Sequence, residues 1–235
     1  MTETHLDFKD RLTSTLTELS ISMFKTMKKI ILFDFDGVIA DSFWQAFEVQ
    51  KMICPSLTKD IFRKMFEGNI NDWKETMNID KKECRSDIDF FTEYIPKMKN
   101  EVQIVPGMKD IIISLEKVYT LIIISSTISS PIREFLEKHD LANHFTEIFG
   151  NDVHKSKVEK IKMVFEKYKA KADDCVFITD TLGDIREAEK MNVKTIGITW
   201  GFHKDETLML GNPFKLAKNP NDLLVTVSDY FNTSN

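Results

Sequence analysis

Short β-branched apolar runs alternate with amphipathic segments over most of the chain. The runs predict buried strands, because they are too short and too continuously apolar for surface helices; they fall at 28–33, 119–124, 175–179 and 194–199, with a short edge strand at 214–217. Helical spacing of apolar residues predicts helices at 107–117, 131–139, 158–168, 185–191 and 221–231. Strands that alternate with helices form a parallel sheet covered on both faces. The pattern therefore predicts a Rossmann-like, doubly wound α/β core.

Residues 43–100 break this alternation. They show no clear strand pattern, but repeated helical spacing with aromatic anchors at Trp73, Phe90, Phe91 and Tyr94. We therefore expect a helical domain at 43–100, inserted into a core formed by 27–42 and 101–235. Residues 1–26 form an N-terminal extension with two alternative interpretations: an additional surface helix, or a leader to a true start at Met27.

Carboxylates follow two of the predicted strands, and small hydroxyl residues follow a third. Asp34 and Asp36 end the first strand, Ser125-Ser126 the second, and Asp180 and Asp184 follow the third. Ligands bind outside the carboxyl ends of strands in open parallel sheets. Residues i and i+2 of an extended chain point the same way, so both first-strand aspartates can face this crevice. Each feature alone is also typical of a turn or a helix cap; together they predict a carboxylate site that requires a cation such as Mg²⁺.

The stretch DFDGVIADS, residues 34–42, resembles the first motif, DxDGxxxDS, of the haloacid dehalogenase-like hydrolases. Ser125 occupies the place of that family's Thr or Ser, and TDTLGD at 179–184 is similar to its acidic fourth motif, although Thr179 replaces the usual glycine. The resemblance covers roughly residues 28–231. It is closest to the phosphoglycolate phosphatase and β-phosphoglucomutase-like branch, in which the insertion is a helical cap over the site.

The resemblance implies a phosphatase that acts on a small phosphorylated metabolite through an aspartyl-phosphate. Asp34 would be the nucleophile and Asp36 the general acid and base. Mg²⁺ would bind Asp34, the backbone carbonyl of Asp36 and Asp180, with Asp184 behind them. Ser125 and Ser126 would bind phosphate oxygens. A sugar phosphomutase with the same residues is the alternative function, and a non-catalytic binding protein is a third.

The family's third motif is a lysine before a helix, and the sequence offers Lys155 and Lys157. If Ser156 caps the helix, Val158, Ile161, Phe165 and Tyr168 form its buried face. This helix phase leaves Lys155 in the loop beside the crevice and favours it over Lys157 as the catalytic, phosphate-binding lysine.

Composition narrows the remaining possibilities. The 235 residues carry a formal net charge of −5, so no overall basic field favours nucleic acid or an anionic membrane as a partner. No apolar run approaches the ~20 residues of a transmembrane helix. Cys54, Cys84 and Cys175 form no CxxC pair, a pattern that favours free thiols in a reducing, cytoplasmic compartment. Nothing in the sequence sets the oligomeric state.

Overall fold

A parallel sheet forms the centre of the protein. The computed structural model describes residues 29–73 and 83–233, so the predicted extension at 1–26 lies outside the described residues. Within them the main sheet has the order β5-β4-β1-β6-β7-β8, with every pairing parallel. Its strands are β1 (Ile30–Phe33), β4 (Thr120–Ile124), β5 (Glu147–Phe149), β6 (Cys175–Thr179), β7 (Lys194–Ile198) and β8 (Lys215–Ala217). The predicted fold class is confirmed.

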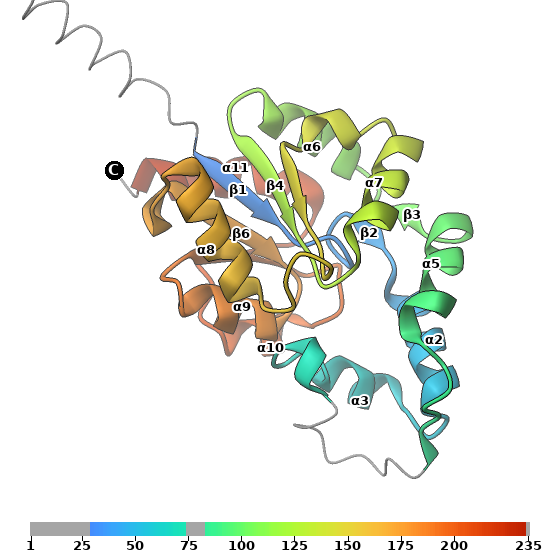
Figure 1. Ribbon diagram of the computed structural model, residues 1–235. Helices are drawn as coiled ribbons and strands as arrows, with labels where there is room; N and C mark the ends of the chain where they lie inside the picture. The colour runs from blue at the N-terminus through green and yellow to red at the C-terminus, as the bar shows by residue number, and fades with distance from the viewer. Residues whose placement is uncertain (1–28, 74–82, 234–235) are drawn as a thin grey trace, which may run out of the picture.

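Helices cover both faces of this sheet (Figure 1). Ile31 and Phe33 of β1 belong to the hydrophobic cluster that includes α6 (Met108–Glu116), α7 (Ser129–Lys138) and α11 (Pro220–Thr233). Ile30 and Leu32 belong to the opposite cluster, with α8 (Lys157–Tyr168) and α9 (Leu182–Glu189). Alternate residues of one strand thus enter two cores, and each fully buried aliphatic side chain contributes roughly 1.5–3 kcal/mol.

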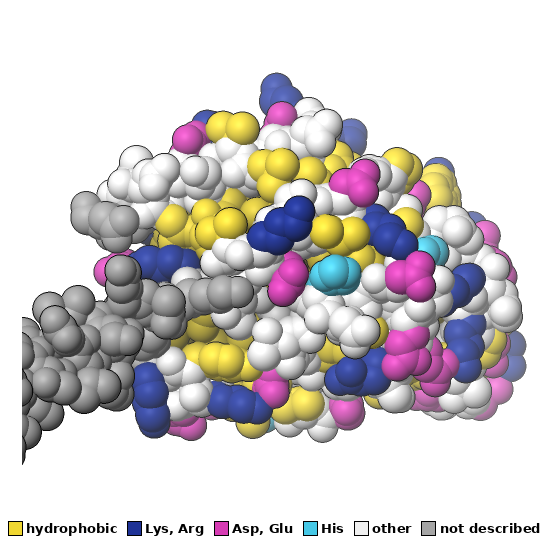
Figure 2. All heavy atoms as spheres, turned by 90° about the horizontal axis from the view of Figure 1, so that it is seen from above, with side chains coloured by type: hydrophobic (Ala, Val, Ile, Leu, Met, Phe, Trp, Pro, Cys, Tyr) yellow, Lys and Arg dark blue, Asp and Glu magenta, His cyan; other side chains and the backbone are white. Residues whose placement is uncertain are grey.

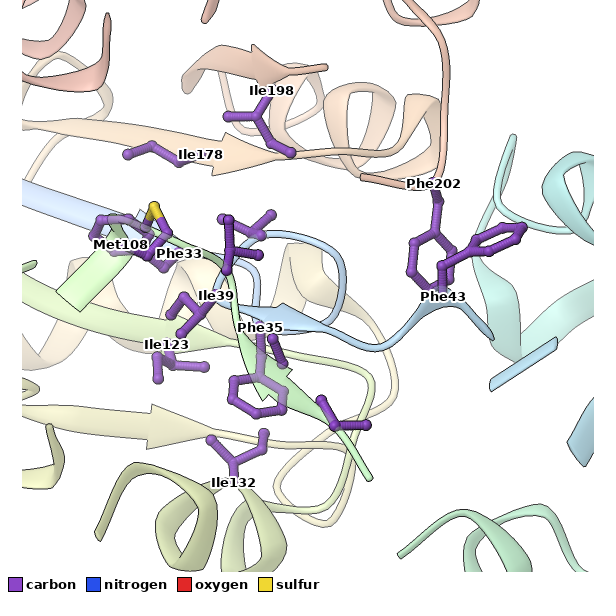
Figure 3. Packing of buried hydrophobic residues seen from close by; sticks show 14 of the residues in the cluster. Phe33, Phe35, Ile39, Phe43, Met108, Ile123, Ile132, Ile178, Ile198 and Phe202 are labelled. Atoms are coloured by element: carbon purple, nitrogen blue, oxygen red, sulfur yellow. The ribbon is translucent and has the colours of Figure 1, made fainter. Parts of the chain in front are cut away.

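A helical insertion leaves the core after β1 and returns before α6. It contains α2 (Phe43–Ile53), α3 (Lys59–Lys64), the 3-10 turn η1 (Ile70–Asp72) and α5 (Phe90–Asn100). The antiparallel pair β2 (Ala40–Asp41) and β3 (Gln103–Ile104) joins it to the core. Phe43 of α2 meets Phe202, from the loop after β7, edge to face at 5.1 Å between ring centroids (Figure 3). The insertion therefore packs directly on the carboxyl edge of the sheet.

The structure corrects the interpretation of the cysteines. Cys54 and Cys84 form a disulfide within the insertion, whereas Cys175 is a buried thiol in β6. The prediction of free thiols is therefore wrong for two of the three residues, since spacing along the chain does not show which cysteines meet in space. A loop of 30 residues closed in this way stabilises the fold by about 3–4 kcal/mol. The cysteine pattern consequently gives no support to the predicted cytoplasmic compartment.

Short elements that were not predicted include β5, a three-residue strand, and α10 (Asp205–Met209). Their runs are too short to show a period in the sequence. In the described ranges no helix has the length and apolar character needed to cross a membrane. On the face shown in Figure 2, acidic and basic side chains are interspersed between hydrophobic ones. That face carries no large patch of one sign of the kind that attracts nucleic acid.

Candidate active site

The three strands predicted to carry the site are neighbours. β1 lies between β4 and β6, and all three run in the same direction. Their carboxyl ends therefore place Asp34, Ser125 and Asp180 at one edge of the sheet, as expected for an open parallel sheet.

Asp34 and Asp36 both face the site, and the residue between them faces the core. Phe35 is fully buried and packs edge-on against Phe135 at 5.2 Å between ring centroids. Asp34 is only 6% exposed, and its Oδ1 accepts hydrogen bonds from the Phe35 amide at 2.8 Å and the Lys157 ammonium at 3.0 Å. Its pKa is raised well above the usual value, chiefly by burial, although the charge of Lys157 acts in the opposite direction.

Asp36 accepts hydrogen bonds from three hydroxyl groups. Ser42 Oγ donates to Oδ1 at 2.8 Å, Tyr94 Oη donates to the same oxygen, and Thr127 Oγ1 donates to Oδ2 at 2.7 Å. Ser42 ends the first motif, Tyr94 comes from helix α5 of the insertion, and Thr127 follows β4. The insertion thus contacts the second aspartate of the motif directly.

Lys157 bridges two carboxylates. Its Nζ lies 3.0 Å from Asp34 Oδ1 and 2.6 Å from Asp184 Oδ2, and the lysine is 3% exposed. Burial alone would lower the pKa of Lys157, but Asp184 and Asp34 outweigh it and raise that pKa above its usual value. Asp184 also accepts a hydrogen bond from Thr179 Oγ1 at 2.7 Å. The threonine that replaces the family's usual glycine therefore fixes a site carboxylate.

Lys155 has a different environment from the one expected. It is exposed, and its backbone carbonyl accepts a hydrogen bond from Asn71 Nδ2 of the insertion at 3.0 Å. The geometry therefore favours the alternative, Lys157, over Lys155 as the lysine of the third motif. The expected buried face was only partly right: Ile161 is buried, and Phe165 and Tyr168 are partly buried against the core. The fully buried residues of α8 are Lys157, Lys160, Ile161 and Val164. Two of these are lysines, so the apolar pattern alone placed the face one position away.

Glu187 fixes the start of α8. Its Oε1 accepts hydrogen bonds from the Lys157 amide at 3.0 Å and from Ser156 Oγ at 3.3 Å. Ser156 makes no side-chain cap of the helix, because its hydroxyl is directed to Glu187. The same carboxylate oxygen accepts from Asn69 Nδ2 of the insertion at 3.3 Å. Glu187 thus connects the buried lysine to the insertion, a role that its sequence position gave no sign of.

Asp180 is a fully buried carboxylate with one unsatisfied oxygen. Oδ2 accepts from the Phe202 amide at 2.7 Å, whereas the buried Oδ1 has no hydrogen-bond partner in the described part of the chain. Burial raises the pKa of Asp180 to about 7, although the Phe202 amide acts against this. Gly37 has φ +76°, and a Cβ there would lie 2.0 Å from Asp180 Oδ2. The glycine after the two aspartates is therefore required by both the turn and the close approach of Asp180.

These residues fit a hard divalent cation. Asp34 and Asp180 are buried carboxylates whose ionised forms are disfavoured, and Asp180 Oδ1 lacks a partner. Among the described residues, no three or more His, Cys, Asp and Glu side chains are grouped so that they could hold a metal ion by themselves. Mg²⁺ does not require such a group, because it is usually held by one or two carboxylates together with substrate phosphate and water.

The two serines after β4 differ. Ser125 is fully buried; its Oγ accepts from the Thr127 amide at 3.0 Å, and its carbonyl accepts from Lys160 Nζ. Ser126 and Thr127 line the cavity beside Asp34, whereas Ser125 does not. The structure therefore brings Ser126 and the unpredicted Thr127 to the site surface. Ser125 stabilises the loop through these two hydrogen bonds.

A cavity of about 420 Å³ lies between the core and the insertion. Core residues on its walls include Asp34, Asp36, Lys157 and Asp184, and the insertion supplies mainly apolar side chains. This volume lies within the ~300–1,000 Å³ typical of small-molecule sites.

Backbone contacts fasten the insertion over this cavity. The Gly183 amide donates to the Phe66 carbonyl at 2.8 Å, and Arg186 donates to the Glu67 carbonyl at 2.6 Å. His203 Nδ1 accepts from the Leu182 amide at 2.9 Å, so its Nε2 carries the proton and donates to the Arg63 carbonyl at 2.8 Å. The loop after α3 is thus docked on the first turn of α9, next to Asp184.

A parallel main sheet with aspartates and a buried lysine at its carboxyl edge, below a helical insertion, defines a Rossmann-like α/β protein with a carboxylate-rich site. Comparison of the sequence with known protein families identifies the family. The model of the haloacid dehalogenase-like hydrolase family matches residues 31–198, and the chain belongs to this family. The predicted resemblance is confirmed.

Two distant relatives match over nearly their full length. The phosphoglycolate phosphatase of Vibrio parahaemolyticus is 23% identical over 221 residues, which cover 85% of this chain and 96% of the relative. That of Synechococcus elongatus is 21% identical, covering 84% and 96%. A haloacid dehalogenase-like hydrolase from Streptococcus pneumoniae has a similar fold, with a TM-score of 0.72 at 20% identity, covering 85% of this chain and 98% of that one.

Proposed function

We propose that this protein is a Mg²⁺-dependent phosphatase that hydrolyses a small phosphate monoester through an aspartyl-phosphate on Asp34. The observation that carries the proposal is the buried bridge from Lys157 to Asp34 and Asp184, with Asp36 beside it at one end of a cavity. The phosphatase names of the distant relatives agree with this proposal.

In the first step a carboxylate oxygen of Asp34 forms a bond to phosphorus as the bond from phosphorus to the ester oxygen breaks. The hydrogen bonds from the Phe35 amide and the Lys157 ammonium are both accepted by Asp34 Oδ1, which orients the carboxyl group. Asp36 gives its proton to the departing alkoxide. Lys157 and the Ser126 and Thr127 loop surround the transferring group, and the ammonium offsets its negative charge.

In the second step Asp36 takes a proton from water, and the water oxygen bonds to phosphorus as the bond from phosphorus to the Asp34 oxygen breaks. This frees the Asp34 carboxylate and orthophosphate. Asp34, the Asp36 carbonyl and Asp180 would hold Mg²⁺, which offsets the charge between the carboxylates and phosphate when bound. The helical insertion acts as a cap that excludes bulk water and brings Tyr94 to Asp36.

The test is a set of phosphate monoesters incubated with the full chain, with Mg²⁺ and with EDTA. We expect Mg²⁺-dependent release of orthophosphate, and a phosphomutase would instead yield an isomeric ester. Trapping of ³²P on the protein during turnover, lost in Asp34→Asn, would identify the intermediate. Orthophosphate release without any labelled protein, under conditions that trap aspartyl-phosphates, would contradict the covalent route.

A further inference from the structure

The cap side of the cavity is mainly aromatic and aliphatic. Its walls include apolar side chains from α3 and the loop after it, from η1 and from α5, among them Phe62, Met65, Phe66, Ile70, Phe90 and Phe91. Phe91 is partly exposed, lies outside both hydrophobic clusters and contacts only the edge of Phe90 among the described ring pairs, at 5.5 Å between centroids. Its ring is thus available to a ligand rather than committed to the core.

No described cap residue on these walls is positively charged. Asp89 is the one charged residue that the described part of the cap contributes, and its carboxylate accepts from the Thr92 amide at 2.9 Å as the N-cap of α5. Of the two core lysines on the walls, Lys157 is paired with Asp34 and Asp184. Lys155 is exposed, where an ion pair contributes only about 0–1 kcal/mol.

Gln50 supplies a hydrogen-bonding group that has no partner. It lies on α2, is 5% exposed and lines the cavity, and its buried amide nitrogen has no hydrogen-bond partner among the described residues. The other amide on the cap walls, Asn71, already donates to the Lys155 carbonyl. The amide nitrogen is enclosed in this conformation, so a ligand oxygen reaches it once the Gln50 side chain turns toward the cavity. A buried donor without an acceptor costs about 1–3 kcal/mol, which that contact would recover.

From these walls we infer that the substrate is the phosphate monoester of an uncharged, largely apolar alcohol with an acceptor oxygen for Gln50. This inference rests on the proposed phosphatase activity and specifies its substrate class. A carboxylate in the leaving group would lie against an apolar wall, and Asp89, the one charged residue that the described part of the cap contributes there, is also negative. A sugar would bring several hydroxyl groups to a wall with one uncommitted amide. Phosphoglycolate, the substrate named for distant relatives, is therefore disfavoured here.

Benzyl phosphate, 2-phosphoglycolate and glucose 6-phosphate provide the test, because all three lose a primary alkoxide. With Mg²⁺ and the full chain, we expect kcat/KM for benzyl phosphate to exceed that for either other ester by about tenfold or more. A higher kcat/KM for 2-phosphoglycolate or glucose 6-phosphate would overturn this inference and leave the phosphatase proposal intact. Hydrolysis of none of them would overturn both.

Variants of the wall provide a second measurement. Phe91→Ala should lower kcat/KM for benzyl phosphate by about tenfold more than it lowers that for 2-phosphoglycolate. Trp44→Ala is the matched control, because Trp44 is a 50% exposed aromatic of the same cap that does not line the cavity. Equal losses for both esters in Phe91→Ala, or equal effects of the two variants, would contradict an aromatic subsite.

Gln50→Leu tests the acceptor. The change removes an unsatisfied buried amide, so thermal stability should be retained or increased. Of 4-ethylbenzyl phosphate and the three methoxybenzyl phosphates, at least one methoxy isomer should have a kcat/KM advantage in the wild type that Gln50→Leu abolishes. A wild type without such an advantage, or an advantage that survives in Gln50→Leu, would overturn the role of Gln50.

Discussion

Gly183→Ala should disturb the contact between the cap and the core without destabilising the fold. Gly183 lies in the first turn of α9, where its amide donates to the Phe66 carbonyl of the cap. A Cβ at this position would lie 2.2 Å from the Gly68 carbonyl oxygen and 2.8 Å from that of Phe66. Contacts below 3.0 Å essentially do not occur, so the cap loop must retreat by about 0.8 Å.

That displacement would lengthen the bond from Gly183 to Phe66 beyond hydrogen-bond range. The same loop contains Asn69, which donates a hydrogen bond to Glu187. Glu187 in turn accepts from the Lys157 amide at the start of α8. A misplacement of ~1 Å in a site can cost about 10²-fold in rate, so we expect kcat/KM to fall by roughly 10- to 100-fold. Alanine is the better helix former by up to ~1 kcal/mol, so the melting temperature should not fall by more than a few degrees.

The measurement is steady-state orthophosphate release from the best ester, together with thermal unfolding. Gly68→Ala is a matched control from the same contact, because a Cβ at Gly68 would have nothing within 4 Å. It should retain near wild-type kcat/KM. Activity of Gly183→Ala within threefold of the control would refute the argument that closure needs this backbone contact.

The remaining predictions concern the carboxylates and lysines. Lys157→Ala should lower kcat by ~10²-fold or more, while Lys155→Ala, the exposed control, should lower kcat much less. The reverse order would favour Lys155 as the lysine of the third motif. Asp34→Asn should abolish turnover with the fold retained, and comparable kcat in a folded variant would disprove its role. EDTA should remove activity and Mg²⁺ restore it. In EDTA, protonated Asp180 stabilises the fold, and this stabilisation declines as the pH rises from its usual pKa of 3.8 toward the folded value of about 7. Asp180→Asn should therefore flatten the decline of the melting temperature between pH 5 and 7.5 and lose the stabilisation by Mg²⁺; an unchanged decline would count against the assignment.

Local sequence determined the sheet and the identity of the principal carboxylates. The β-branched runs before Asp34 and Asp180 are short and continuously apolar, so only buried parallel strands accommodate them. The spacing of two between Asp34 and Asp36 then sets both on one side of the chain, with Phe35 on the other. These conclusions depend on periods of a few residues, which the sequence displays directly.

Only the tertiary structure decided which lysine is buried and what contacts the aspartates from the cap. The phase of α8 is set by Asp34, Asp184 and Glu187, which bind Lys157 from other parts of the chain and turn a charged residue inward. Tyr94 reaches Asp36 across 58 residues. The disulfide between Cys54 and Cys84 likewise joins segments 30 residues apart. Such partners depend on how the cap packs on the core. Hydrophobic periodicity predicts only which faces are apolar, so it cannot predict that a charged residue is buried.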